Sequence, residues 1–355
     1  MKPFYVTRSR TCVYAIPGCV GVLLLIIVVS RASYGHQKTK NTNIDVGIAR
    51  HFTRSYTCSE QEVNANAEFF SISHTYCPSE PWYWEWQSQI EVDDPVYVEV
   101  GCNKATDAIM NLRAFTGDTR VDIDDWMNET QFRDLACPFD RERWEQVVRH
   151  TPRKLIQYRH FCIEAAAENA RPVKAAAEKL GYNILGLHSD HYAVSSSSNP
   201  KTIKFPVIPP GGEQFGMDTD NSAFTEFYDV SVISVDEFVA MKGSKRVDVL
   251  KIDTEGNDPL VINGAIHTLA HMKPGYVQFE NHGVGRWKSW RLKDVIDLLD
   301  HLSYECFWAT NSGRLIRLSA CWSSDYDKKK TWSNVACYHR EEEKLAQIME
   351  SLRYR

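Results

Sequence analysis

The chain has 355 residues, of which 43% are hydrophobic and 25% charged, and its formal net charge is −5. This length can form one large domain of about 250 residues or two smaller ones, and the composition is that of a globular protein. Because phosphate neutralisation needs a basic surface, the acidic balance excludes nucleic acid as an expected partner.

The N-terminus contains a long apolar run. The segment "TCVYAIPGCVGVLLLIIVVS" carries no charge and, at about 1.5 Å per residue, spans roughly 30 Å, the thickness of a bilayer's hydrocarbon core. Lys2, Arg8 and Arg10 precede it, so the positive-inside rule predicts a single-pass type II membrane protein of the ER or Golgi. The alternative is a cleaved signal peptide, although "VVSRA" is a poor cleavage site. Both interpretations place the remaining chain in the lumen of the secretory pathway or outside the cell.

Eight of the ten cysteines follow this apolar run. The chain has no CxxC pair, so we predict no zinc site, and an oxidising compartment favours disulfides. Closeness in sequence predicts the pairs Cys58–Cys77 and Cys321–Cys337. Asn128 begins the one N-glycosylation sequon, which indicates a glycoprotein.

From residue 94 onward, short apolar runs typical of buried strands alternate with segments of helical periodicity. Strands are predicted at 95–101, 157–165, 182–188, 247–253, 276–280, 304–310, 313–319 and 334–340, and helices at 104–114, 167–181, 258–270 and 292–302. Strands that are separated by helices of this length indicate βαβ units, so we expect an α/β fold with a mainly parallel sheet.

Two segments interrupt this alternation. "HYAVSSSSNPKTIKF" at 191–205 is typical of a hairpin that turns at Ser-Asn-Pro. Residues 115–155 are too long for a plain connection and indicate an inserted lobe, for which we suggest a covering role over the site. Its spaced aspartates resemble a calcium loop but lack that motif's glycine and terminal glutamate.

The sequence thus divides into six parts. They are a cytosolic tail (1–10), a transmembrane signal anchor (11–31), a stem (32–56), a flap rich in cysteine and aromatic residues (57–93), a main domain (94–340) with its insertion (115–155), and a C-terminal helix (341–355). The aromatic run "PWYWEW" in the flap could pack against the core or stack on sugar rings.

Two carboxylates stand where a buried strand ends. Asp253 and Glu255 follow the apolar run "VDVLKI", directly before a helical pattern. Open α/β sheets bind their ligands at such strand ends. The two carboxylates therefore line a site, or Glu255 caps the helix that begins near Asn257.

The first two predicted strands supply similar residues. Glu99 ends the first strand, and Gly101 and Asn103 lie in the turn into a helix, where backbone N–H groups are unpaired. Glu164 ends the second strand, the position at which an acid accepts hydrogen bonds from ribose hydroxyls in dinucleotide folds. The turn is not GxGxxG, so a nucleoside cofactor without phosphates fits better than a dinucleotide.

These segments together resemble a known family. "LKIDTEGNDPLVINGA" resembles the hallmark "LKID-x-EG-x-E-x-x-VL-x-GA" of FkbM-type S-adenosylmethionine-dependent methyltransferases. "YVEVGCNKAT", "CIEAAAENA" and "HYAVSSSSNPKTIKF" with "VISVDEF" match further family segments, and the resemblance covers roughly residues 94–282. Two positions depart from it: Ala105 replaces a glycine of the cofactor turn, and Asp258 replaces a glutamate usual one position earlier.

The resemblance implies a Rossmann-like methyltransferase fold, with a mostly parallel seven-stranded sheet flanked by helices, and S-adenosyl-L-methionine as cofactor. It implies that Gly101 and Asn103 border the methionine part of this cofactor and that Glu99 orders their loop. It further implies that Glu164 binds the ribose hydroxyls.

On the same resemblance, Asp253 faces the methyl group and the acceptor, with Glu255 beside it. Asp253 is our first choice for the base that takes the acceptor's proton, and His282 in "FENHG" is the second. A loop histidine satisfied by hydrogen bonds is the alternative for His282. We predict no metal; a divalent cation held by Asp253, Glu255 and His282 is the weaker possibility.

We therefore expect an O-methyltransferase that acts in the lumen on a small molecule or glycan, with a sugar hydroxyl as the favoured acceptor. The alternative is a non-catalytic, membrane-anchored glycan-binding or receptor ectodomain on the same fold. A glycosyltransferase is less favoured, because the Asp-x-Asp at 122–124 lies in the insertion and not at a strand end. Neither the acceptor nor the oligomeric state follows from the sequence.

Overall fold

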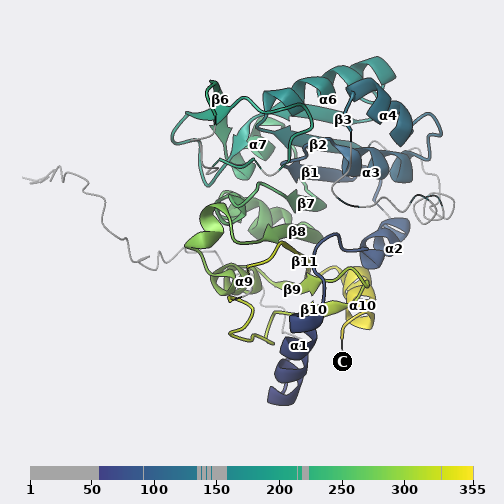
Figure 1. Ribbon diagram of the computed structural model, residues 1–355. Coiled ribbons are helices and arrows are strands. Elements are labelled where there is room, and N and C mark those ends of the chain that lie inside the picture. The colour runs from purple at the N-terminus through teal and green to yellow at the C-terminus, as the bar shows by residue number, and fades with distance from the viewer. Residues whose placement is uncertain are drawn as a thin grey trace, which may run out of the picture. The chain divides into compact units, whose positions relative to one another are not determined.

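The computed structural model describes residues 56–354 except 91, 134–136, 138–140, 142–144, 146–157, 214, 218–223 and 329 (Figure 1). The predicted tail, transmembrane anchor and stem up to residue 55 lie outside the described residues. In the part of the chain that is described, no helix is both long enough and apolar enough to cross a bilayer.

A mixed eight-stranded sheet organises the fold, with strand order β10-β9-β11-β8-β7-β1-β2-β3 (Figure 1). Its strands are β1 (Val96–Val100), β2 (Arg159–Glu164), β3 (Leu187–His191), β7 (Val249–Ile252), β8 (Tyr276–Asn281), β9 (Tyr304–Ala309), β10 (Leu315–Arg317) and β11 (Ser333–His339). Strands β8, β7, β1, β2 and β3 are parallel, whereas β11, β9 and β10 pair in antiparallel fashion. The predicted α/β class is confirmed. The seven-stranded sheet that the family resemblance implies is wrong, because all eight strands predicted from the apolar runs, β10 at 313–319 included, join one sheet.

Helices cover both faces of this sheet. The helices are α1 (Glu60–Ile72), α2 (Pro81–Gln89), α3 (Thr106–Thr116), α4 (Ile123–Thr130), α6 (Ala167–Leu180), α7 (Val235–Met241), α8 (Asp258–Asn263), α9 (Leu292–His301) and α10 (Glu343–Ser351), with the shorter η2 (Thr268–Met272) and η3 (Gly285–Lys288). One core cluster joins α7, α8 and α9 to the sheet, and a second joins α2, α3, α4, α6 and α10. Helix α6 ends at Gly181 in a left-handed conformation, as predicted.

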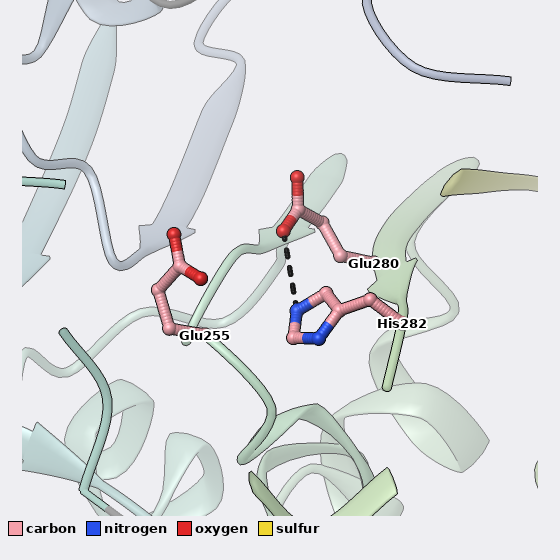
Figure 2. Close-up of side chains that lie close together, drawn as sticks. All are labelled: Glu255, Glu280 and His282. Atoms are coloured by element: carbon pink, nitrogen blue, oxygen red, sulfur yellow. Dashed lines mark ion pairs between the residues drawn. The ribbon is translucent and has the colours of Figure 1, made fainter. Parts of the chain in front are cut away.

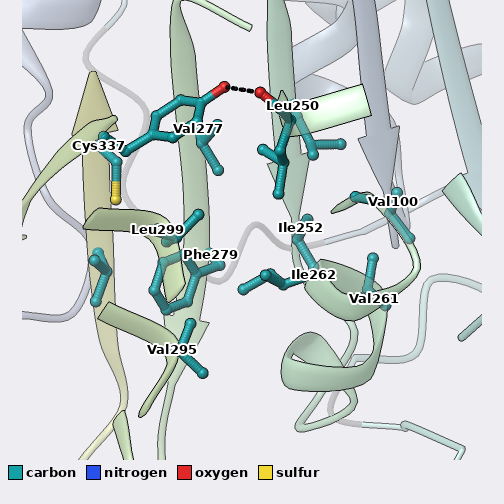
Figure 3. Packing of buried hydrophobic residues seen from close by; sticks show 14 of the residues in the cluster. Val100, Leu250, Ile252, Val261, Ile262, Val277, Phe279, Val295, Leu299 and Cys337 are labelled. Carbon is teal, nitrogen blue, oxygen red and sulfur yellow. Dashed lines mark hydrogen bonds between the residues drawn. The ribbon is translucent and has the colours of Figure 1, made fainter. Parts of the chain in front are cut away.

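The central strands are buried on both sides, which explains their apolar runs. Every residue of β1 is buried, with Val96, Val98 and Val100 in one core cluster and Tyr97 in the other. Figure 3 shows the first cluster, in which apolar residues of β7 and β8 pack against side chains of α8 and α9. Helices on both faces of parallel strands require such near-continuous apolar sequences.

A second, three-stranded sheet lies beyond β3 in sequence, with order β4-β6-β5. Its strands are β4 (Ala193–Val194), β5 (Thr202–Pro206) and β6 (Phe227–Ile233). The predicted hairpin at 191–205 is wrong, since β4 and β5 do not pair with each other. Each pairs instead with one edge of β6, which lies between them.

The described part of the insertion at 115–155 packs against the main domain. Asp122 caps α4 by accepting hydrogen bonds from the N–H groups of Asp124 and Asp125, so these spaced aspartates begin a helix. The fully buried Trp126 donates its indole N–H to the carbonyl of Lys104 at 2.8 Å. Most of residues 134–157 lies outside the described residues.

The eight cysteines in the described part of the chain form four disulfides. They are Cys58–Cys321, Cys77–Cys137, Cys102–Cys162 and Cys306–Cys337. The predicted pairs Cys58–Cys77 and Cys321–Cys337 are wrong, because nearness in space and not in sequence decides the pairing. Cys306 and Cys337, for example, are direct partners in the register of β9 and β11, with Cα atoms 4.1 Å apart.

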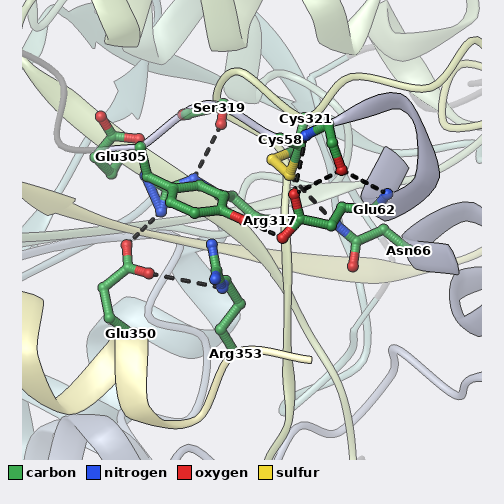
Figure 4. The surroundings of a disulfide bond; sticks show 11 residues. Cys58, Glu62, Asn66, Glu305, Arg317, Ser319, Cys321, Glu350 and Arg353 are labelled. Carbon is green, nitrogen blue, oxygen red and sulfur yellow. Dashed lines mark hydrogen bonds and ion pairs between the residues drawn. A yellow bond between two sulfur atoms is a disulfide. The ribbon is translucent and has the colours of Figure 1, made fainter. Parts of the chain in front are cut away.

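A buried ion network fastens the C-terminal helix to the sheet (Figure 4). Arg317 on β10 is fully buried and pairs with Glu305 of β9 at 2.8 Å and with Glu350 of α10. Its Nε also donates to the carbonyl of Ser319 at 3.2 Å. The nearby Cys58–Cys321 disulfide ties the segment before α1 to the same region.

The replacement Arg317→Met should lower the free energy of unfolding by about 3 kcal/mol, because it leaves the buried carboxylate of Glu305 with one partner fewer. Urea denaturation measures this loss. Arg291→Met is the matched control: its ion pair with Asp327 is exposed and should contribute less than about 1 kcal/mol. Equal losses in the two variants would contradict the structural role of the network.

Candidate functional site

One cavity of about 1120 Å³ lies at the carboxyl ends of β1, β2, β7 and β8 and continues along one face of the sheet. All the predicted site residues line it: Glu99, Gly101, Asn103, Glu164, Asp253, Glu255 and His282. Parallel strands bring their carboxyl ends to one edge, and this explains how distant parts of the sequence meet here. The roles assigned to these residues stay predictions.

The turn after β1 has a left-handed backbone at three positions. The φ angles of Gly101, Asn103 and Ala105 are 81°, 47° and 55°. A Cβ on Gly101 would lie 1.7 Å from the carbonyl oxygen of Asp253, so only glycine allows the β1 and β7 turns to approach this closely. Ala105, which stands where the resembling family has glycine, adopts a conformation that side chains disfavour.

Glu164, at the end of β2, stabilises the turn after β1 through hydrogen bonds. Its Oε2 accepts the N–H of Asn103 at 2.8 Å, and its Oε1 accepts the N–H of Ala166 at 2.7 Å. Burial outweighs these two bonds and raises the pKa of Glu164 to about 7. Each carboxylate oxygen keeps a second lone pair, so Glu164 can also accept hydrogen bonds from a ligand in the cavity.

Asn169, which the sequence analysis missed, joins the β1 turn to the segment after β5. This residue of α6 is buried, and its Oδ1 accepts the N–H of Gly211 at 2.8 Å. Its Nδ2 donates to Asn103 Oδ1 at 3.4 Å and to the carbonyl of Gly212 at 3.3 Å. The only signal in the sequence was its place in "CIEAAAENA", where helical periodicity does not distinguish it from a surface asparagine.

Asp253 follows β7 and lies beside other acidic groups. Its N–H donates to the carbonyl of Val100 at 2.8 Å, which fixes the backbone against β1. Burial raises the pKa of Asp253 above its usual value, although the Lys251 ammonium lowers it, and its side chain is hydrogen-bonded to Glu280. A carboxyl group in this position is a stronger base than an exposed aspartate.

Glu255, Glu280 and His282 converge from the β7–α8 turn and the end of β8 (Figure 2). One oxygen or nitrogen atom from each lies within 4.8 Å of those of the other two. Burial lowers the pKa of His282 to about 4, so its ring is neutral at pH 7. The sequence analysis missed Glu280, although it ends the predicted strand at 276–280 and lies two residues before His282, a spacing that puts two side chains on one face of an extended backbone.

Asp258 holds the β7–α8 turn against β8 from a fully buried position. Its carboxylate accepts the Thr254 hydroxyl at 3.1 Å, the N–H of Gly256 at 3.2 Å and the N–H of Glu280 at 3.1 Å. Burial, followed by the charge of Asp253, raises the pKa of Asp258 to about 7. Asp258, one of the two positions that depart from the family pattern, therefore stabilises the turn that follows Asp253.

Glu99 contacts its neighbours across the sheet. Its Oε2 lies 2.8 Å from His160 Nε2, and its Oε1 lies 3.5 Å from Lys251 Nζ. In the strand register Lys251 stands between Glu99 and Gln278, so a polar row crosses β1, β7 and β8 along the cavity. The ordering of the β1 turn by Glu99 stays a prediction.

The N-terminal segment forms the outer wall of the cavity. Tyr83 and Trp84 of the "PWYWEW" run line the cavity, whereas Trp82 and Trp86 are buried in the core. The Cys77–Cys137 disulfide links this wall to the insertion, and both cysteines line the cavity. The run therefore packs against the core and also offers aromatic surface to a ligand.

The methyltransferase FkbM domain family matches residues 140–306, a range that includes β2, β7 and β8 but begins after the β1 turn. No curated protein matches the chain. Among solved structures, the crystal structure of precorrin-6y C5,15-methyltransferase from Geobacter metallireducens GS-15 is similar, with a TM-score of 0.31 and 8% identity over 76% of this chain and 92% of that chain. At these values the likeness supports no inference.

The replacement Gly101→Ala should lower the free energy of unfolding by about 3 kcal/mol or more, because the new methyl group overlaps the Asp253 carbonyl and φ is positive. Gly181→Ala is the matched control: its φ is +74° but nothing lies within 4 Å of the added Cβ, so about 1 kcal/mol is expected. Denaturant unfolding of both variants measures the difference. A loss at Gly101 no larger than that at Gly181 would disprove the close contact.

Glu164 and Asp258 should each make a contribution to the free energy of unfolding that falls as the pH rises from about 4.5 to 7. The pKa values of Glu164 and Asp258 rise from 4.5 and 3.8 to about 7 in the folded chain, which therefore binds more protons than the unfolded chain in this window. Urea denaturation at several pH values measures the slope, and Glu164→Gln should make it shallower. A slope that Glu164→Gln leaves unchanged would contradict the raised pKa of Glu164.

Proposed function

Because this chain carries a methyltransferase FkbM domain at residues 140–306, as its motifs predicted, we propose that it is an S-adenosylmethionine-dependent O-methyltransferase. Its proposed acceptor is a sugar or glycan hydroxyl, and its proposed location is the lumen of the secretory pathway. The observation that supports this most strongly is the single cavity onto which Gly101, Glu164 and Asp253 all open.

The residues around the β1 turn fit a nucleoside that carries a positive charge. The close backbone approach at Gly101 leaves the turn without a side chain, and Glu164 offers a carboxylate at the position used for ribose hydroxyls. Acidic groups predominate at this edge of the cavity, which favours a cation over a pyrophosphate. When bound, S-adenosylmethionine supplies a methyl group on a sulfonium, and S-adenosylhomocysteine is the product.

Asp253 is the proposed base. It lies at the end of β7, between the β1 turn and Glu280, and its raised pKa strengthens it as a proton acceptor. His282 is a weaker candidate, because its ring nitrogens bind a proton only near pH 4. Holding the acceptor oxygen in line can lower the barrier by about 7 kcal/mol or more in the best cases.

A sugar suits the outer part of the cavity. Its lining combines the aromatic residues Tyr83, Trp84 and Trp332 with the amide side chains of Gln278 and Asn334. Aromatic faces cover the apolar side of a sugar ring, while amides can both donate to and accept from its hydroxyls. This mixture supports a polyhydroxylated acceptor over a purely apolar one.

Two observations support a location in the secretory pathway. The four disulfides involve all eight cysteines of the described part, as expected in an oxidising compartment. The uncharged run at 11–30 has the length of a transmembrane anchor. A type II orientation in the ER or Golgi, or secretion after cleavage, is consistent with both.

Isothermal titration of the purified full chain with S-adenosylhomocysteine tests the cofactor site. Glu164→Gln should weaken binding at least about tenfold, because a neutral amide cannot accept two charge-assisted hydrogen bonds from ribose. Asp253→Asn should bind within about threefold of the natural chain but lose at least about 100-fold in methyl transfer to sugar acceptors. Release of S-adenosylhomocysteine measures the transfer.

Glu178→Gln, an exposed substitution on α6, is the control and should leave binding and transfer unchanged. No binding at millimolar S-adenosylhomocysteine by a folded chain would favour the non-catalytic ectodomain. If Glu164→Gln leaves binding of S-adenosylhomocysteine unaffected, the cofactor does not bind at the end of β2.

A further inference from the structure

We propose that Glu255, Glu280 and His282 bind a divalent transition cation of the Mn²⁺ class beside the end of β7. The metal site stands on its own geometry. Only its part in catalysis rests on the proposed methyltransferase function.

The spacing of the three side chains matches a shared cation. Their candidate ligand atoms all lie within 4.8 Å of one another, and Glu280 Oε2 is 3.7 Å from His282 Nε2 (Figure 2). Two ligands at about 2.1 Å from one ion, at angles of about 90–120°, are about 3.0–3.6 Å apart. Small side-chain movements would therefore bring all three atoms into coordination distance.

His282 presents an unsatisfied nitrogen to this space. The side chain has an exposed fraction of 7%, and Nε2 has no hydrogen-bond partner among the described residues. Its Nδ1 accepts the N–H of Val284 over a long distance of 3.4 Å. Coordination through Nε2 would move the ring proton to Nδ1 and give up this weak contact. A buried nitrogen without a partner costs free energy that a cation would offset.

Glu280 is oriented so that one oxygen faces His282. Trp332 donates its indole N–H to Oε1, which leaves Oε2 on the side of the imidazole. In the described part of the chain, no lysine or arginine forms an ion pair with Glu280. The acids Asp253, Glu255 and Asp258 act electrostatically on Glu280, and its side chain is also hydrogen-bonded to Asp253. A cation would relieve this repulsion.

The ligand set indicates the class of cation. Two carboxylates and one imidazole mix oxygen with nitrogen, a combination that suits first-row transition ions better than Ca²⁺. Three protein ligands leave coordination positions open, and an acceptor hydroxyl bound there would lose its proton more readily. That proton would pass to Asp253 while the acceptor oxygen forms its bond to the methyl carbon and the carbon–sulfur bond breaks. The cation would thus position the acceptor next to the base.

Titration of the purified full chain, free of any affinity tag, with Mn²⁺ tests the site, with the electron paramagnetic resonance signal of free Mn²⁺ as readout. We expect one site per chain. Glu280→Gln and His282→Gln should each weaken binding at least about tenfold. The glutamine at 280 keeps the shape of the side chain and can still accept the Trp332 N–H. Glu255→Gln, in a partly exposed turn, gives the same test without a change in the core.

His267→Gln with His271→Gln is the control, because these exposed, adjacent rings could bind Mn²⁺ on the surface. This double variant should keep the site. The proposal is overturned if the folded chain binds no Mn²⁺ at millimolar concentration, if all three site variants bind as the natural chain does, or if only the control loses binding. Titration of the natural chain with S-adenosylhomocysteine separates the two proposals: a chain that binds S-adenosylhomocysteine but no Mn²⁺ rejects the metal site alone, and a chain that binds Mn²⁺ but no S-adenosylhomocysteine rejects the cofactor site alone.

Discussion

The contact between the β1 and β7 turns is the constraint on which the site depends. Gly101 has no side chain, and its Cα lies against the carbonyl of Asp253, while the N–H of Asp253 is bonded to Val100. This contact continues the parallel register of Val100 with Ile252 beyond the ends of the strands. Because the two backbones touch, the acids that follow β7 open onto the same cavity as the turn that follows β1.

The acidic groups of the site are held mainly by backbone donors. Glu164 accepts two N–H groups, and Asp258 accepts two N–H groups and a hydroxyl. By contrast, Glu305 in the C-terminal network is neutralised by Arg317 and Arg340. Backbone donors fix these two carboxyl groups in place without a paired cation, so burial raises their pKa values to about 7 and they can take up or release protons near neutral pH.

The hydrophobic patterns in the sequence predicted the strands, because each strand's burial is visible in its own residues. The apolar runs located β1, β2, β7 and β8, and the residues at their ends proved to line one cavity. The partners of β6 and of the cysteines depend on contacts between distant segments, which periodicity does not encode. Glu280 and Asn169 were missed for the same reason: their importance comes from the side chains that face them. The N-terminal anchor stays a prediction.

The Cys77–Cys137 bond closes a covalent loop of the chain that contains α2, β1, α3 and α4. Both cysteines belong to the cavity's outer wall, so its two sides cannot separate as independent flaps. These two positions of the lining therefore stay joined for as long as the disulfide is intact.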